Sequence, residues 1–202
     1  MEDFLDTKVA EERIKARESK YNSIETGVYV EHKLVEFETI KLFEGKLSVA
    51  LPNWVQKMPL KVRKIKYPSE ERPQEIFSNE GGEVNFAFSR YEMPIEPDET
   101  IEAVQQFRSM IQKVHPANIF YELQEETVGE PGLETKLSWF DFKGYAVDMQ
   151  TYNLMYVMPL AKGMLHGVFN CPFKSAASWK KAALLIARSA RDLTLKRKDE
   201  IR

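Results

Sequence analysis

The 202-residue sequence contains one cysteine and three histidines, so it has few side chains from which to build a disulfide, a redox centre or a metal site. Cys171 alone cannot form an internal disulfide, which favours a reducing cytoplasm over a secreted location. The histidines His32, His115 and His166 lie far apart, and no HExxH or CxxC motif occurs. We therefore predict neither a metal ion nor another cofactor.

The sequence also lacks a long apolar run and a large excess of either charge. Its longest apolar run, LMYVMPLA, is too short to span a bilayer, and the first 20 residues contain no apolar segment typical of a signal peptide. The net charge of −2 leaves no overall surplus of positive charge for nucleic acid phosphates. We expect a soluble cytoplasmic protein that binds neither membranes nor nucleic acids.

Motifs typical of catalysis are missing as well. The sequence contains no GxGxxG or GxxxxGK[ST] phosphate loop and no GxSxG nucleophile motif. Cys171, in FNCPF, has His166 as its nearest base, but residues five apart on one strand face opposite sides. Asp141 and Asp148 form the best candidate acid pair. We predict that the protein is not an enzyme, and keep a hydrolase-type enzyme with a sheet pocket as an alternative.

The residues that are present predict one folded domain with short charged extensions. Hydrophobic residues make up 43% of the chain, which is enough for one sizeable core. Residues 1–25 alternate acids and bases and predict a solvated helical extension. Residues 26–195 form the predicted single domain, and residues 196–202 form a charged tail.

Glycines and apolar periodicity predict the elements of this domain. Two hairpins should turn at Glu44-Gly45 and at residues 79–82. Apolar residues at helical spacing predict a helix at 98–114, with Asp98 as its N-cap, and another at 174–193 with Ser175 or Ser178 as its cap. Residues 119–171 should form antiparallel strands; the predicted turns lie at 129–132, 143–144, 153 and 162–163.

This order of elements resembles the PsbP-like fold, shared by the photosystem II oxygen-evolving subunit P and a Ran-binding nuclear-import factor. The resemblance rests on these stretches: LFEGKLSVALPNW, VNFAFSRYEMP, the helix at 98–114, WFDFKGYAVDMQTYNLMYVMP, and MLHGVFNCPFKSAASWKKAALLIARSARDL. Asn53 replaces the usual glycine before Trp54. The resemblance implies an α+β domain, an antiparallel sheet flanked by helices, that acts through protein contacts.

One short element, YPSEERPQ, stands out as a candidate binding site. Its two prolines predict a rigid elbow that directs Arg72 and Gln74. The Arg72 guanidinium could pair with an internal acid such as Glu70, or with a carboxylate of a ligand or partner. Other binding candidates are the aromatic residues Tyr67, Trp54 and Trp139, which could line a sheet face.

Two further patterns have both a structural and a functional interpretation. A basic cluster, in which cations alternate with apolar residues, could be a surface for an acidic partner or a solvated edge strand. Its members are Lys57, Lys61, Arg63, Lys64 and Lys66. The methionines that are dense late in the chain could form an adaptable binding surface or fill gaps in the core. They are Met149, Met155, Met158 and Met164.

The leading hypothesis is a non-catalytic cytoplasmic module that binds an unidentified protein partner, by family analogy in a secretion or toxin–immunity setting. The N-terminal helix would be the arm that faces the partner. A carrier of small anionic ligands with Arg72 as its clamp, and the enzyme with a sheet pocket, are the alternatives.

Overall fold

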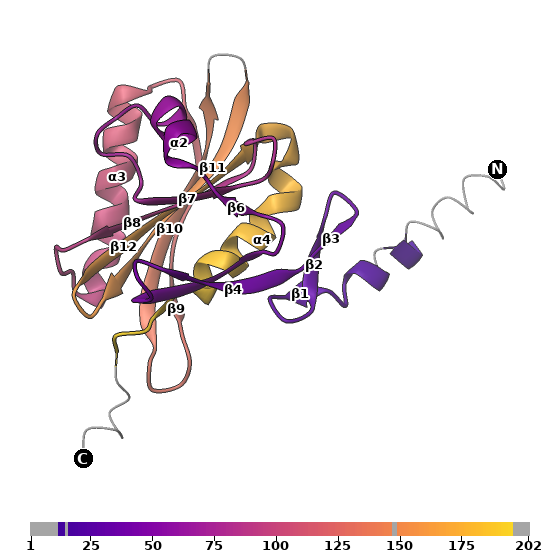
Figure 1. Cartoon of the computed structure of the whole chain (residues 1–202), viewed down its shortest axis with the longest axis horizontal. Coiled ribbons are helices and arrows are strands. Elements are labelled where there is room, and N and C mark those ends of the chain that lie inside the picture. The colour runs from indigo at the N-terminus through magenta and orange to yellow at the C-terminus, as the bar shows by residue number, and fades with distance from the viewer. Residues whose placement is uncertain (1–11, 15, 147–148, 196–202) are drawn as a thin grey trace.

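The computed structural model describes residues 12–14, 16–146 and 149–195 of the chain. A seven-stranded antiparallel sheet forms its centre, in the spatial order β6-β7-β8-β12-β11-β10-β9 (Figure 1). The strands are β6 (Gln56–Lys57), β7 (Glu75–Ser78), β8 (Asn85–Tyr91), β9 (Ile119–Val128), β10 (Thr135–Tyr145), β11 (Gln150–Leu160) and β12 (Gly163–Pro172). The antiparallel meander predicted for residues 119–171 is confirmed as strands β9 to β12.

Both predicted hairpins are present. Strands β4 (Phe37–Leu42) and β5 (Leu47–Pro52) are joined by a turn that contains Gly45 at φ +84°, and β7 and β8 by a turn that contains Gly82 at φ +69°. Glycine adopts these left-handed conformations without steric cost. Strand β5 also pairs with the short β13 (Arg191–Asp192), so that β13, β5 and β4 form a second sheet.

Two of the four turns predicted within the meander are wrong. Lys143-Gly144 lies inside β10, and Asn153 lies inside β11, where it pairs with Phe142 and Asn170. The chain reverses later, where the Ala146 N–H donates to the Met149 carbonyl over 2.8 Å. Gly144 serves another purpose: an added Cβ would lie 3.0 Å from the side chains of Thr151 and Asn153, so the glycine makes room within the sheet.

The two faces of the central sheet are covered by different helices. Phe86, Phe88 and Phe169 lie on the face that we call the α4 face, because Phe86 and Phe169 pack against Trp179 of α4 (Ala176–Ser189), with ring centroids 6.2 and 5.5 Å from it. Helix α4 is shorter than the predicted 174–193, and it follows a 3-10 turn, Phe173–Ser175. Neither Ser175 nor any other side chain caps its start by a hydrogen bond.

The opposite face carries Ala87, Ser89, His166 and Val168, and we call it the α3 face. Helix α3 (Thr100–Val114) packs on it through Val104 and Phe107, which confirms the predicted helix. The predicted Asp98 cap is wrong. A 3-10 turn, η1 (Pro97–Glu99), precedes the helix. A capping box at the start of η1 pairs the backbone N–H groups of Glu96 and Glu99, each with the side chain of the other residue.

The edge-strand interpretation of the basic cluster holds for Lys57, which lies on the edge strand β6, and is wrong for the other four residues, which are helical. Helix α2 (Leu60–Lys66) contains Lys61, Arg63, Lys64 and Lys66, and none of its residues is buried. It forms because tertiary hydrogen bonds hold it: Arg63 donates to the Gln74 carbonyl and Lys66 to the Gly82 carbonyl. Such a short, unburied helix leaves little periodic signal in the sequence.

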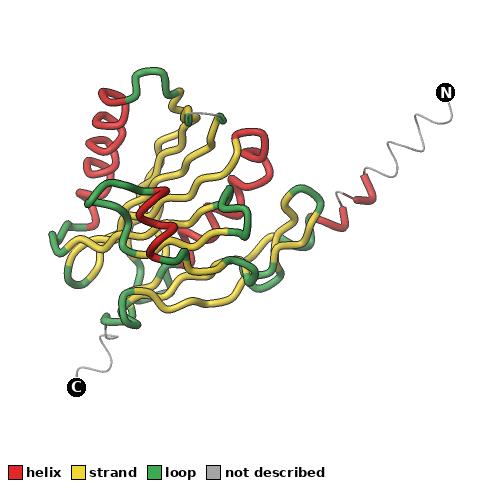
Figure 2. Tube along the Cα trace, turned by 45° about the horizontal axis from the view of Figure 1, so that its top comes forward, coloured by secondary structure: helices red, strands yellow, loops and turns green. Residues whose placement is uncertain are grey.

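The N-terminal part adds a small sheet of its own. Strands β1 (Asn22–Ser23), β2 (Gly27–Val30) and β3 (Lys33–Val35) pair in that order and extend to one side of the molecule (Figure 2). Of the predicted N-terminal helix, residues 12–14 and 16–18 are helical; residues 1–11 and the predicted tail at 196–202 lie outside the described residues. Among the described helices, none is long and apolar enough to cross a bilayer.

Helices packed on a mainly antiparallel sheet confirm the predicted α+β class.

Candidate functional site

Arg72, the first predicted binding residue, is turned onto its own loop. Its Nε donates to the Tyr67 carbonyl over 2.9 Å, and its Nη2 lies 3.4 Å from the Pro68 carbonyl and 3.5 Å from the Glu70 carboxylate. Only 16% of the side chain is exposed. The geometry favours the internal alternative, in which the guanidinium holds the YPSEERPQ turn closed.

Gln74 and Tyr67 are also used inside the fold. The Gln74 side chain imitates a strand: its Oε1 accepts from the Arg90 N–H over 3.0 Å, and its Nε2 donates to the Arg90 carbonyl over 3.1 Å. Tyr67 follows α2 and packs near Ala87 on the α3 face. Burial raises the pKa of its hydroxyl, while a hydrogen bond with Asn170 partly offsets this.

The two predicted tryptophans lie elsewhere. Trp139 is buried on β10, donates from Nε1 to Glu126 over 3.1 Å, and has the Lys180 ammonium 5.5 Å from its ring centroid. Trp54, partly exposed after β5, meets Trp179 edge to face at 6.0 Å. Tryptophans on the α4 side and Tyr67 on the α3 face do not meet, so the five predicted residues form no single site.

Cys171 is poorly placed to act as a nucleophile. It is buried on β12, and its pKa is raised to about 12, mainly by burial and further by the charge of Glu31. A thiol with a raised pKa is present almost entirely in its unreactive, protonated form at neutral pH. His166 lies on the α3 face whereas Cys171 lies on the α4 face, as the odd spacing predicted.

Asp141 belongs to a structural network. Its Oδ1 accepts from the Glu122 N–H over 2.8 Å, and its Oδ2 accepts from the Tyr152 hydroxyl at 2.9 Å and lies 2.8 Å from Lys180 Nζ. Because β10 is irregular between Phe140 and Phe142, this carboxylate satisfies a backbone donor that the strand ladder misses. The proposed partner acid, Asp148, lies outside the described residues.

Across the described parts of the chain, at 12–14, 16–146 and 149–195, no three His, Cys, Asp or Glu side chains come together as metal ligands.

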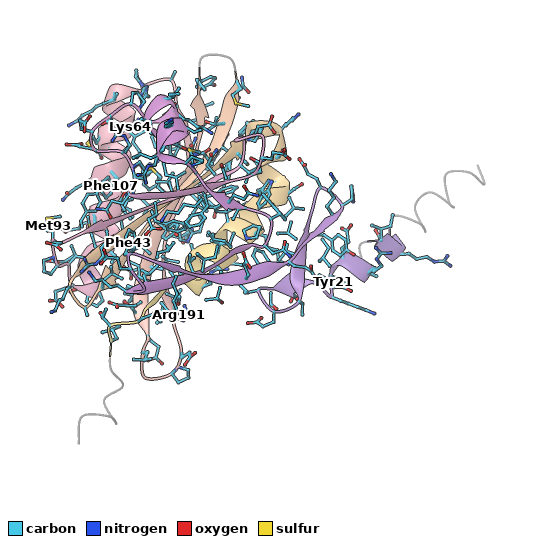
Figure 3. All side chains as sticks on the ribbon, viewed as in Figure 1. Tyr21, Phe43, Lys64, Met93, Phe107 and Arg191 are labelled. Carbon is cyan, nitrogen blue, oxygen red and sulfur yellow. The ribbon has the colours of Figure 1, made fainter. Side chains whose placement is uncertain are left out.

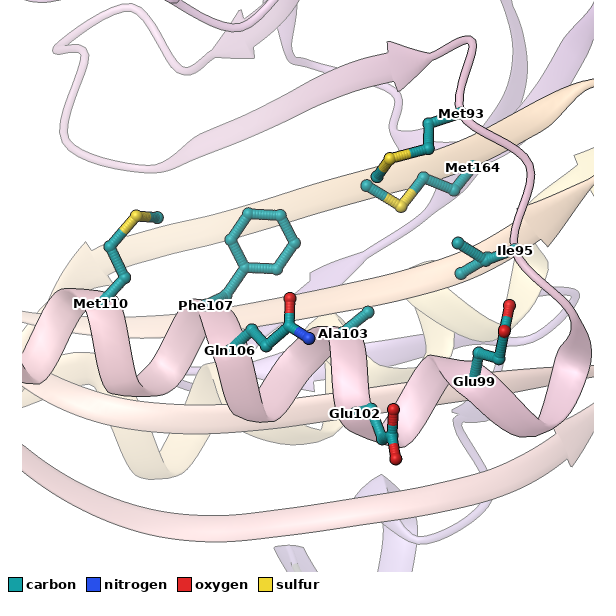
Figure 4. Close-up of a pocket in the computed structure, with 9 residues that line it drawn as sticks. All are labelled: Met93, Ile95, Glu99, Glu102, Ala103, Gln106, Phe107, Met110 and Met164. Carbon is teal, nitrogen blue, oxygen red and sulfur yellow. The ribbon is translucent and has the colours of Figure 1, made fainter.

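The most distinctive surface feature is a cleft beside α3, which we call the methionine cleft. It has a volume of about 450 Å³, and it lies between α3 and the segment that follows β8 (Figure 4). Its apolar lining consists of Met93, Ile95, Ala103, Phe107, Met110 and Met164. Met93 and Met110 are 59% and 54% exposed, so the cleft presents two large apolar side chains to solvent side by side with its buried lining.

Figure 4 shows how the cleft is built. Phe107 and Met110 rise from α3 on the side of Met93, and Met164 reaches toward Met93 from β12. The residue spacing explains part of this geometry, since positions 107 and 110 are one turn apart on α3. Sequence reasoning missed Met93 and Met110, and considered only the later methionines.

The rim of the methionine cleft is acidic. Glu99 and Glu102 lie at one side of it with Gln106, and Figure 4 shows them around the start of α3. Negative charge at this end of α3 is also favoured by the helix dipole. The cleft thus combines flexible apolar side chains with carboxylates, which suits an apolar group that carries positive charge beside it.

A neutral histidine lies directly beneath the cleft. The His166 ring stacks on Phe107, with centroids 4.5 Å apart and an interplanar angle of 8°. Its Nε2 atom is buried and has no hydrogen-bond partner among the described residues. Burial lowers the pKa of His166 to about 4, so the imidazole is uncharged at neutral pH.

Comparisons with known proteins inform the fold rather than the cleft. No protein-family model matches the sequence, and no curated protein matches it. The solution structure of cyanobacterial PsbP (CyanoP) from Synechocystis sp. PCC 6803 is similar, with a TM-score of 0.55 and 13% identity, over 82% of this chain and 98% of that one. The Ran-binding protein Mog1p of Saccharomyces cerevisiae is similar at a TM-score of 0.50 and 12% identity, over 79% of this chain and 96% of Mog1p. These matches, together with the observed arrangement of sheet and helices, show that the chain has the PsbP-like fold.

Proposed function

We propose that this chain is a non-catalytic protein-binding module, and that a segment of its partner binds in the methionine cleft. The observation that carries the proposal is the pair of exposed methionines, Met93 and Met110, on either side of a cleft that has Phe107 in its lining. Methionine side chains are flexible and polarizable, and they suit surfaces that adapt to a protein partner. That Mog1p is a Ran-binding protein supports a role in protein contacts for this fold.

The chemistry of the cleft defines the segment that would fit. A volume of about 450 Å³ with an apolar lining has room for an apolar side chain, and the carboxylates of Glu99 and Glu102 favour lysine or arginine beside it. The proposed ligand is therefore a peptide segment with an apolar anchor and basic neighbours. A cytoplasmic location is part of the proposal, because the sole cysteine, Cys171, is a buried free thiol.

The alternative of a small anionic ligand held by Arg72 has less support. The guanidinium already donates to the carbonyls of Tyr67 and Pro68, and a ligand would have to displace these contacts. The enzyme alternative has less support for the same kind of reason, since both Cys171 and Asp141 are engaged inside the fold.

Selection from a random peptide library on the immobilised protein tests the proposal, and it does not require the natural partner to be identified first. The selected peptides should carry a Leu, Phe or Met anchor beside Lys or Arg. Met93→Asp and Met110→Asp should each weaken their binding by about tenfold or more, because a hydrated carboxylate would replace an apolar contact with the anchor.

Met149→Asp is the matched control, because Met149 is also partly exposed but lies at the β10–β11 turn, outside the cleft. Peptides that bind Met93→Asp and Met110→Asp as tightly as the unmodified protein would show that the cleft is not the binding site.

A further inference from the structure

A second apolar surface on the molecule has the opposite charge. Helix α2 exposes Leu60, Val62 and Ile65, and Ile65 is 82% exposed. Lys61 and Lys64 lie on the same helix, and neither forms an ion pair within the described part of the chain. We call Leu60, Lys61, Val62, Lys64 and Ile65 the α2 surface; Figure 3 labels Lys64 on it.

The other two cations of α2 face the protein. Arg63 donates to the Gln74 carbonyl, and Lys66 donates to the Gly82 carbonyl and, over 2.9 Å, to Asn85 Oδ1. Burial lowers the pKa of Lys66, and the nearby Glu83 opposes this effect. The helix is therefore fixed by one side, and its apolar side chains and Lys61 and Lys64 remain available to a partner.

The α2 surface and the methionine cleft lie over the same face of the sheet. Tyr67, directly after α2, packs with Ala87 and Val168, and Phe107 of α3 stacks on His166. Val168 pairs with Ala87, and His166, two residues earlier on β12, pairs with Ser89, so all four point to one face. A basic apolar surface and an acidic apolar cleft are thus neighbours over the α3 face.

We infer that a second copy of this chain binds across the α3 face, with the α2 surface of each copy in the methionine cleft of the other. This inference rests on the proposed function, because it assigns to the cleft a ligand of the proposed kind, with Ile65 as the apolar anchor and Lys61 and Lys64 as its basic neighbours. The charges complement each other, since Glu102 on the cleft rim also forms no ion pair within the described residues.

Two-fold symmetry makes both contacts form at once. In a symmetric dimer the same patch of both subunits faces itself, so any contact between α2 and α3 occurs twice. A two-fold axis that passes between α2 and α3 brings each basic surface to the other copy's acidic rim. The dimer also closes both clefts, so that a peptide partner and the second copy compete for the same residues.

A charge exchange tests the dimer by analytical ultracentrifugation at low salt. The first variant, Glu102→Lys with Gln106→Lys, makes the cleft basic, and the second, Lys61→Glu with Lys64→Glu, makes the α2 surface acidic. All four side chains are exposed, so both variants should fold, as circular dichroism would verify. Each variant alone faces like charges in both contacts, and its self-association should weaken at least about tenfold.

The mixture of the two variants gives the decisive result. A heterodimer restores opposite charges in both contacts, so an equimolar mixture should dimerise again. A full-length protein that stays monomeric at about 0.1 mM, or charge variants that dimerise as well as the unmodified protein, would overturn the inference. If mixing the two variants gives no stronger association than either variant shows alone, the inference is overturned as well.

A second pair of variants checks the apolar contact. Ile65→Asp should abolish dimerisation, and Leu193→Asp should leave it unchanged, because Leu193 is also an exposed apolar residue but lies beside the β4–β5 turn, where its N–H donates to the Lys46 carbonyl. Loss of the dimer in both variants, or in neither, would contradict the assignment of Ile65.

Failure of this inference differs from failure of the proposed function. A monomeric protein that still binds library peptides through Met93 and Met110 overturns the dimer alone. If both hold, the selected peptides should also dissociate the dimer in proportion to the cleft sites they occupy.

Discussion

Protonation of His166 should make an identifiable contribution to the destabilisation of the protein by acid. The His166 imidazole stacks on Phe107, its Nε2 is buried without a hydrogen-bond partner among the described residues, and burial lowers its pKa to about 4 from the ordinary value of 6.5. Between these two values the unfolded chain binds a proton that the folded chain does not. The free energy of unfolding therefore contains a contribution that is fully present above pH 6.5 and is lost as the pH falls toward 4.

The size of the effect follows from the shift. At about 1.4 kcal/mol per pKa unit, the full contribution is roughly 3 kcal/mol, of which about 2 kcal/mol disappears between pH 7 and pH 5. Urea unfolding of the unmodified protein and of His166→Gln at several pH values measures it, because the carboxylates titrate in both proteins and their effects cancel in the difference.

The His166→Gln variant should lose about 2 kcal/mol less than the unmodified protein over this range. His115→Gln is the control for histidine replacement, since His115 is exposed after α3. Equal pH dependence in His166→Gln and the unmodified protein would refute the reasoning, because the imidazole would then not be desolvated beneath Phe107.

Three further predictions concern the core. Gly167→Ala should lower the free energy of unfolding by about 3 kcal/mol in urea titrations, because the new Cβ would lie 2.0 Å from the Tyr156 ring; a loss below about 1 kcal/mol would mean that this ring moves freely. Asp141→Asn should lower the free energy of unfolding by roughly 2 kcal/mol, since it removes the buried negative charge that pairs with Lys180 and accepts from the Tyr152 hydroxyl. Glu125→Gln breaks only the partly exposed pair with Lys136 and should lower it by less than about 1 kcal/mol. Equal losses in the two variants would show that burial does not strengthen the Asp141 contacts. Cys171 should react with iodoacetamide at neutral pH far more slowly than glutathione does, because it is buried with a pKa of about 12, and a reaction as fast as that of glutathione would reopen the thiol-enzyme alternative.

The elements of the fold that have a local cause were the ones predictable from the sequence. Gly45 and Gly82 marked their hairpins because a positive φ is a property of the turn itself. Helix α3 was predictable because its apolar residues repeat with the period of a helix. The turn predicted at Gly144 is wrong because glycine is needed there for a reason that is not local. The residue makes room for side chains of β11, which only the strand register brings near.

The candidate site depends on contacts between distant parts of the chain, which explains why sequence reasoning missed it. Met93 follows β8, Met110 is on α3, and Met164 begins β12, so only the order of strands in the sheet brings them together. Arg72 was recognised as unusual, but the carbonyls that bind it come from Tyr67 and Pro68, whose orientation the sequence does not specify. The prolines of YPSEERPQ predicted a stiff turn, and the structure gives that turn a hydrogen-bonding arginine at its centre.

Methyl NMR of the methionines can show whether a protein segment binds in the methionine cleft. With methionine methyl groups labelled by ¹³C, a peptide selected on the protein should shift the signals of Met93, Met110 and Met164, the three methionines of the cleft. The buried Met58 and Met158 and the distant Met149 should stay in place and serve as internal references. Shifts confined to Met58, Met149 or Met158, with the three cleft signals unmoved, would show that the peptide binds outside the methionine cleft.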